Sequence, residues 1–269
     1  MYLLKNLGGK MIYGLSLGSG GARGIAHLAF LQEIKKRNYK FEIVTGTSAG
    51  AIIGALYAID PEKDYTFLFK EVMEKNESTI KKLSKELNSG INVLKKMITS
   101  KSVIENNFAY KMFKDFYGKK KFSECKLKLG VVAFDIISGE NVEITEGYVI
   151  DAVMASSCVP GAFKPMQLGG MEIVDGAVLT EVPVNLAKKL GAQYVVANHV
   201  SPIILEKEYF NGMQYLEYLD EYKVEFITQD ELKNAEEIYT FNGENFWYEF
   251  FEYENVLKNA KEIYGSVML

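Results

Sequence analysis

The sequence predicts an α/β fold, built as a three-layer α/β/α sandwich around a mostly parallel central sheet. Two observations lead to this prediction. Short apolar runs at residues 11–17 and 41–44 are each followed by a glycine-rich turn and then by a helical pattern. A further apolar run, residues 194–198, has the composition of a buried strand. Strands that alternate with helices along the chain are typical of parallel sheets covered by helices.

The first strand, residues 11–17, leads into a glycine-rich loop, GSGGARG, at residues 18–24. The helix that we expect over residues 25–36 follows directly. Backbone N–H groups in such a loop, at the start of a helix, can bind a negative charge. A dinucleotide fingerprint is the alternative, but Arg23 stands where a G-x-G-x-x-G motif starting at Gly18 needs its third glycine. The loop therefore favours an oxyanion site over a nucleotide site.

The second unit is a strand at residues 41–44, the turn GTSAG at residues 46–50 and a helix at residues 51–57. A G-x-S-x-G motif between a strand and a helix is the nucleophile elbow, a sharp turn that projects the serine hydroxyl. An ordinary glycine-rich turn is the alternative, and the flanking strand and helix favour the elbow. Ala49, directly after the serine, is small and leaves its N–H free. Ser48 is therefore the predicted nucleophile.

Three side chains compete for the role of catalytic base. His27 shares a helical face with apolar residues, which favours a place in the core. His199 ends a strand-like run, where α/β active sites lie, and the order serine, acid, histidine suits an α/β-hydrolase triad. Asp175 ends a short strand-like run before Gly176, and a partly desolvated carboxylate there could accept the serine proton. A turn aspartate is the alternative for Asp175, so the residues alone leave His199 and Asp175 open.

Three segments, taken together and in this order, resemble the patatin-like phospholipase family: residues 19–24, 46–50 and 175–177. Residues 155–165 also resemble the segment that this family carries before its aspartate. The resemblance extends from about residue 11 to about residue 200. Ser19 is a departure, because the family usually has glycine at this position.

The resemblance implies a Ser–Asp dyad without a catalytic histidine, in which Ser48 is the nucleophile and Asp175 the base. It also implies an oxyanion hole formed by the N–H groups of Gly20 and Gly21. No cofactor and no metal ion are expected. The residues that we expect to support the site or contact the substrate are Ser19, Arg23, Ala49, Pro160 and Gly176.

The activity implied by the resemblance is hydrolysis of acyl esters in phospholipids or other lipids, as a phospholipase A or an esterase. Two alternatives remain open at this point. One is a Ser-His-Asp esterase or thioesterase that uses His199 as its base. The other is a lipid-binding or regulatory protein without turnover, against which the intact Ser48, Asp175 and glycine loop argue.

Composition describes a globular chain with a core: 48% of the 269 residues are hydrophobic and 25% are charged. No apolar run approaches the ~20 residues of a membrane span. The two cysteines, Cys125 and Cys158, are too few for a disulfide framework and indicate reduced packing residues. Residues 1–10 lack the apolar core of a secretion signal and are expected to be a dispensable extension. These features predict a cytoplasmic protein, with peripheral membrane contact as an open expectation.

Charge and aromatic residues divide the chain into two parts. Residues 201–269 contain fifteen Asp and Glu against five Lys, a net charge of −10, so the remaining chain carries +6 of the total of −4. Fifteen of the 34 aromatic residues also fall in this acidic tail. A segment so rich in aromatics should pack, either on the body or on a partner subunit as part of a homodimer. The acidic total and the absence of a binding motif argue against nucleic acid.

The predicted domain plan therefore has a catalytic domain at residues 1–200 and an acidic, aromatic extension at residues 201–269. Within the first part, lysines concentrate between residues 61 and 128, for example at residues 81–82, 95–96 and 119–121. We expect this region to form helices over one side of the site. Its lysines form either an ordinary solvated face or a surface that attracts anionic lipid.

Overall fold

The structure, a computed structural model, describes residues 10–37, 39–78, 80–81, 99–100, 102–200, 212–243 and 253–268. Several expectations fall outside these residues: the extension up to residue 9, the lysines at 82 and 95–96, and the aromatic cluster at residues 246–251.

A central sheet of eight strands dominates the described part of the chain. Its strands are β1 (Tyr13–Leu17), β2 (Phe41–Thr47), β4 (Lys128–Asp135), β5 (Glu140–Ile144), β7 (Met166–Leu168), β8 (Met171–Asp175), β9 (Tyr194–His199) and β10 (Glu237–Thr240). Five strands run parallel in the order β10-β9-β1-β2-β4. A smaller sheet pairs β3 (Ser102–Ile104) with β6 (Gly161–Phe163).

The antiparallel end of the sheet decides how the site is formed. β5 pairs with β4 at residues 131–135 and so occupies one edge of that strand. The opposite edge of β4 is shared, because β2 pairs in parallel with residues 128–132 and β8 pairs antiparallel with residues 133–135. β2 and β8 therefore approach each other along one edge of β4, and their carboxyl ends meet. β7 completes this end of the sheet by pairing with β8.

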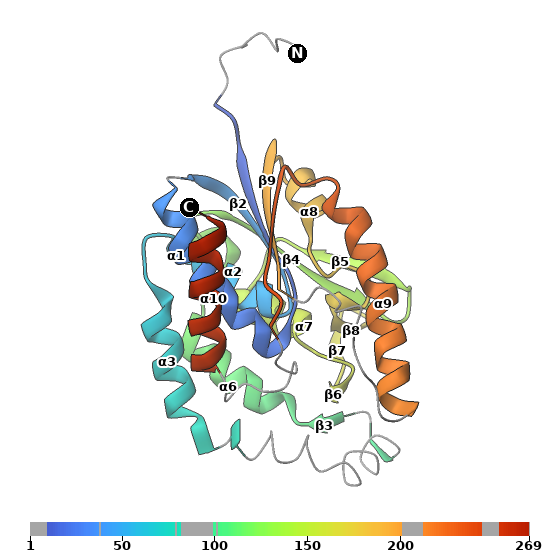
Figure 1. Cartoon of the computed structure of the whole chain (residues 1–269). Helices are drawn as coiled ribbons and strands as arrows, with labels where there is room; N and C mark the ends of the chain where they lie inside the picture. Colours follow the sequence, from blue (N-terminus) through green and yellow to red (C-terminus); the bar gives the residue numbers. More distant parts are fainter. Residues whose placement is uncertain are drawn as a thin grey trace.

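Helices cover the sheet on both faces, as Figure 1 shows. The α-helices are α1 (Ala26–Lys36), α2 (Ala49–Ile59), α3 (Tyr65–Lys75), α6 (Asn106–Tyr117), α7 (Val149–Ser156), α8 (Val184–Lys189), α9 (Gly212–Leu232) and α10 (Tyr253–Val267). Short 3₁₀ turns are η1 (Gly21–Ile25), η2 (Phe122–Glu124) and η3 (Gly176–Val178). The main core joins one face of the sheet to α1, α2, α3, α6, α7 and α10.

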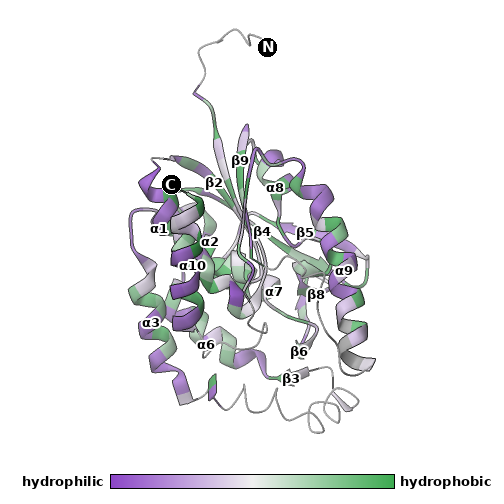
Figure 2. Ribbon diagram, viewed as in Figure 1, coloured by the Kyte–Doolittle hydropathy of each residue, from purple (hydrophilic) through white to green (hydrophobic). Residues whose placement is uncertain are grey.

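The second face has a separate apolar cluster, in which Val184 and Ala187 of α8 pack with Val195 and Ala197 of β9 and with Leu232 of α9. Figure 2 shows hydrophilic stretches along the outer helices α3 and α9, away from the apolar strands. Burial of apolar surface on both faces is the main driving force for this arrangement. The expected three-layer α/β fold with a mostly parallel sheet is therefore confirmed, and the antiparallel strands lie at the β4 end.

The acidic tail contributes to the same sheet and to the main core. β10 pairs in parallel with β9, from Glu237 beside Val196 to Thr240 beside His199. Tyr264 of α10 lies in the core, with its ring centroid 5.3 Å from that of Phe30 in α1. Among the helices described, none is both long and apolar enough to cross a bilayer.

Candidate active site

Ser48 lies at the sharp turn between β2 and α2, as the sequence motif predicts. Its backbone has φ 53° and ψ −118°, and no other non-glycine residue in the described part of the chain has positive φ. Such a conformation is strained for a residue with a side chain and persists only where the surroundings enforce it. The close packing of Gly50 is one such constraint, because a Cβ there would lie 2.1 Å from the Leu17 carbonyl oxygen. The turn therefore has the geometry of a nucleophile elbow.

A second serine, Ser156, holds this turn in place. The backbone N–H of Ser48 donates to Ser156 Oγ at 2.8 Å, and that hydroxyl donates to the Val132 carbonyl at 2.6 Å. Ser156 is fully buried at the last position of α7. No role was predicted for Ser156 from the sequence, because it is one small residue in a run of small residues and nothing in its spacing distinguishes it.

Asp175 reaches the turn because two strands end at the same place. Thr47, the last residue of β2, lies beside Val132, and Asp175, the last residue of β8, lies beside Ala133. The Ser48 side chain lies near enough to the Asp175 carboxyl group to lower the pKa of Asp175. Residues 127 positions apart in the sequence are thus brought into contact by the head-to-head meeting of β2 and β8.

The carboxyl group of Asp175 is deeply buried, with 3% of the residue exposed. Its Oδ1 accepts the N–H of Ala177 at 2.9 Å, and its own backbone N–H donates to the Cys158 carbonyl at 3.0 Å. Burial raises the pKa of Asp175 to about 7, although the Ser48 side chain and the Ala177 N–H oppose the rise. A carboxyl group with such a pKa can gain and lose a proton near neutral pH.

The glycine loop lies against the elbow. A Cβ on Gly24 would come within 2.2 Å of the Ala49 Cβ, so η1 and α2 are in direct contact. Gly20 and Gly21 have φ of 153° and 54°, a conformation that favours glycine. The N–H of Ser19 is already bonded to the Glu181 carbonyl at 2.9 Å. No hydrogen bond leads from the N–H of Gly20 or Gly21 to any other described residue.

The other supporting residues predicted from the sequence are spread around this centre. Gly176 follows Asp175 directly, and a Cβ there would lie 2.4 Å from the Val132 carbonyl oxygen. Arg23 lies within η1, and its Nε is buried without a hydrogen-bond partner among the described residues. Pro160 is exposed in the turn before β6. Gly176 thus has a clear packing role, whereas the described contacts assign none to Pro160.

The two histidines have different surroundings. His27 is buried, with Nε2 at 2.8 Å from the Gly18 carbonyl oxygen and Nδ1 at 2.9 Å from Asn198 Nδ2. Burial lowers the pKa of His27 to about 4, so it is neutral at ordinary pH. His199 is also buried, and its Nε2 lies 3.6 Å from Glu181 Oε1 and 3.5 Å from Glu225 Oε2. Burial opposes protonation of His199, but these two glutamates outweigh it and raise its pKa.

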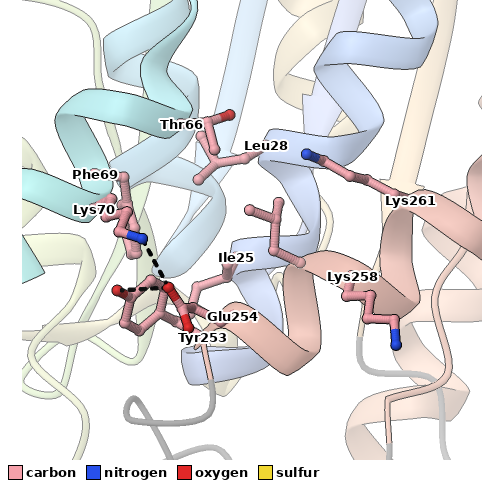
Figure 3. A pocket seen from close by; sticks show the side chains of 10 residues that line it. Ile25, Leu28, Thr66, Phe69, Lys70, Tyr253, Glu254, Lys258 and Lys261 are labelled. Atoms are coloured by element: carbon pink, nitrogen blue, oxygen red, sulfur yellow. Dashed lines mark hydrogen bonds and ion pairs between the residues drawn. The ribbon is translucent and has the colours of Figure 1, made fainter.

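A surface hollow of about 340 Å³ lies apart from these residues, between α1, α3 and α10 (Figure 3). Ile25, Leu28 and Phe69 are among its apolar lining residues, and Lys70 in its wall forms an ion pair of 3.0 Å with Glu254. The residues that line it include no serine, cysteine or histidine. Its position therefore does not identify it with the chemistry at Ser48.

The geometry defines an α/β protein with a serine elbow, an adjoining buried aspartate and a glycine-rich loop. Residues 15–188 match the family model described as patatin-like phospholipase, and the chain therefore belongs to this family. The resemblance found in the sequence motifs is thereby confirmed.

Relatives and solved structures agree with this assignment. An uncharacterised NTE family protein of Mycobacterium tuberculosis is 26% identical over 183 residues, which are 68% of this chain and 47% of that protein. A lysophospholipase NTE1 of Candida albicans is 28% identical over 201 residues, which are 71% of this chain and 13% of that protein. The chain thus spans about half, or less, of the length of these curated relatives. The structure of VipD from Legionella pneumophila matches with a TM-score of 0.50 and 14% identity, covering 96% of this chain and 67% of that one, which supports the fold.

Proposed function

We propose that this protein is a serine lipid acyl hydrolase, of the phospholipase A or esterase type, that works through a Ser48–Asp175 dyad. The observation that carries the proposal is the meeting of the strained Ser48 and the buried Asp175 where β2 and β8 end beside β4. Membership of the patatin-like phospholipase family and similarity to a protein named lysophospholipase support a lipid ester as substrate.

In the acylation step, Asp175 accepts the proton of the Ser48 hydroxyl while Oγ attacks the ester carbonyl carbon. A tetrahedral intermediate forms, and its negative charge falls on the former carbonyl oxygen. The N–H groups of Gly20 and Gly21 have no described partner, so they are available to donate to that oxygen. Collapse of the intermediate breaks the bond to the alcohol, which takes the proton from Asp175 and leaves Ser48 acylated.

Deacylation repeats the chemistry with water as the nucleophile. Asp175 accepts a proton from the water molecule as its oxygen attacks the acyl carbon. The second tetrahedral intermediate collapses, the proton returns to Ser48 Oγ, and the fatty acid is released. The pKa of about 7 suits this double role, because the carboxyl group must accept and return a proton in each cycle.

The proposal is tested with three variants: Ser48→Ala, Asp175→Asn and His199→Gln. Hydrolysis of a lysophospholipid and of a p-nitrophenyl acyl ester would be measured for each, with folding checked by circular dichroism. We expect turnover to be abolished in the first and reduced by at least about 1000-fold in the second. The His199 variant should retain most of the activity, because the nearest described partners of its ring are Glu181 and Glu225.

Ser266→Ala is the matched control for Ser48→Ala, since it removes an exposed hydroxyl of α10 that donates to a backbone carbonyl. This control should hydrolyse both substrates at the parental rate. If a folded His199→Gln variant loses turnover and Asp175→Asn retains it, the dyad hypothesis is wrong and a triad that uses His199 as its base is favoured. A folded protein that binds lipid but hydrolyses neither substrate would instead favour the non-hydrolytic alternative.

A further inference from the structure

Three ionisable side chains from separate elements meet beside the glycine loop. Glu181 lies between η3 and α8, His199 is the last residue of β9, and Glu225 belongs to α9. His199 Nε2 is 3.6 Å from Glu181 Oε1 and 3.5 Å from Glu225 Oε2. One donor atom from each of the three residues lies within 4.8 Å of the other two.

The polar atoms at the centre of this cluster lack hydrogen-bond partners. Both ring nitrogens of His199 lack a hydrogen-bond partner in the described part of the chain, and so does Glu225 Oε2. The His199 side chain is 0% exposed, so its nitrogens cannot be satisfied by bulk water. A buried polar group without a partner is rare in folded proteins and indicates an ordered water or an ion.

Each glutamate also accepts a hydrogen bond from a neighbouring side chain. Ser19 Oγ donates to Glu181 Oε1 at 3.3 Å, and Gln229 Nε2 donates to Glu225 Oε1 at 2.6 Å. Such outer contacts hold the carboxylates of metal sites in the orientation that the ion requires. Glu225 has 12% of its side chain exposed, which provides a route from solvent to the cluster.

We propose that Glu181, His199 and Glu225 form a binding site for one Zn²⁺ ion, with water as a fourth ligand. A tetrahedral Zn²⁺ with bonds of about 2.1 Å holds neighbouring ligand atoms roughly 3.4 Å apart, close to the two separations from His199 Nε2. One imidazole nitrogen and two carboxylates suit Zn²⁺, whereas Mg²⁺ and Ca²⁺ prefer sets made only of oxygen. The ion would join the connection between η3 and α8 to β9 and α9. No metal ion was expected from the sequence, in which residues 181, 199 and 225 show no metal-binding spacing.

The three side chains could also form an ion-pair cluster without a metal ion. A protonated His199 between the two carboxylates, with the guanidinium of Arg23 near enough to act on it electrostatically, would balance the same charges. The two accounts differ in one measurable quantity, the stoichiometry of bound Zn²⁺.

The experiment uses the full-length protein without an affinity tag, stripped with EDTA and dialysed. Titration calorimetry with ZnCl₂ and elemental analysis after dialysis should both show one Zn²⁺ per chain. His199→Gln and Glu225→Gln should each weaken binding by about 100-fold or more, since they remove a direct ligand. Asp230→Asn, which removes an exposed carboxylate from the same helix, is the matched control and should bind Zn²⁺ as the parent does.

Zn²⁺ should also raise the melting temperature of the parent protein and of Asp230→Asn, but not of the two ligand variants. Less than one Zn²⁺ per chain would overturn the proposal in favour of the ion-pair cluster. Equal affinity in the parent and in both ligand variants would show that Zn²⁺ binds elsewhere. Binding is measured without substrate, so the outcome is independent of whether the protein hydrolyses lipids.

Discussion

Replacing Asp175 by asparagine should make the fold more stable above pH 7 while it removes the proposed base. The structural reason is that Asp175 is 3% exposed and must carry a buried charge when it ionises. An asparagine of the same shape keeps an oxygen for the Ala177 N–H, which lies 2.9 Å from Oδ1, and carries no charge. The Asp175→Asn variant should therefore be more stable than the parent above pH 7 and nearly inactive.

The magnitude follows from the pKa of Asp175, which is about 7 in the fold against an ordinary value of 3.8. A carboxyl group with a raised folded pKa contributes stability below its unfolded pKa, and this is lost as the pH rises through the folded pKa. Between pH 5 and pH 8 the parent should lose about 2–3 kcal/mol of unfolding free energy relative to Asp175→Asn, at about 1.4 kcal/mol per unit. Above about pH 8 the difference between the two proteins should level off.

Urea unfolding of both proteins at pH 5, 6, 7 and 8 measures this difference directly. Asp135→Asn is an informative control, because Asp135 is a buried aspartate of opposite character. Burial opposes its ionisation, but the Ser138 side chain and the N–H groups of Ile137, Ser138 and Glu172, which lie at 3.0–3.2 Å, lower its pKa overall. Its asparagine variant should be less stable than the parent at pH 8. A difference between Asp175→Asn and the parent that does not change with pH would refute the raised pKa.

Three further predictions concern the same site. kcat/KM should rise about tenfold per pH unit up to about pH 7 and then level off, because Asp175 must be ionised; a profile that is flat below pH 7 would contradict this. Ser156→Ala removes the side-chain acceptor of the Ser48 N–H and the hydroxyl donor to the Val132 carbonyl, and should cost about 1–3 kcal/mol in urea unfolding and lower kcat. Unchanged kcat would show that the elbow needs no such support. Gly21→Ala, at φ 54°, should lower kcat by about 100- to 1000-fold with little change in the Kd of a non-hydrolysable lipid, and a proportional loss of lipid binding would argue against an oxyanion role.

Local sequence patterns predicted the elbow and the strands beside it well. The G-x-S-x-G motif placed Ser48 at a turn between a strand and a helix, and the structure gives it φ 53°. The expected strand at residues 41–44 extends to Thr47, so that it leads directly into the turn. These features depend on neighbouring residues, which is why a single sequence is sufficient to predict them.

Contacts between segments that are distant in the sequence could not be predicted from local sequence patterns. Asp175 meets Ser48 because β8 runs antiparallel to β4 and ends opposite β2, and this register has no local signature. Only the family resemblance related the two residues. Ser156 and Glu181 were missed for the same reason, since their partners Ser48, Val132 and Ser19 are distant in sequence.

The acidic tail, residues 201–269, shows what composition alone does not predict. Its charge and aromatic content predicted packing, and the structure adds that β10 extends the central sheet and that Tyr264 donates to Asn198 at 2.8 Å in the core. Composition carries no information on which strand the tail pairs with. A homodimer, peripheral membrane contact and the boundary at residue 200 stay predictions.

The most direct test of the central claim is labelling with a fluorophosphonate, followed by peptide mapping. The reagent forms a covalent bond with an activated serine, and we expect one adduct per chain at Ser48. The adduct should be absent from Ser48→Ala and should form much more slowly in Asp175→Asn, while His199→Gln should react like the parent. Two results would contradict a nucleophilic role for Ser48. One is stoichiometric labelling of another serine, and the other is full hydrolysis of lipid esters by the Ser48→Ala variant.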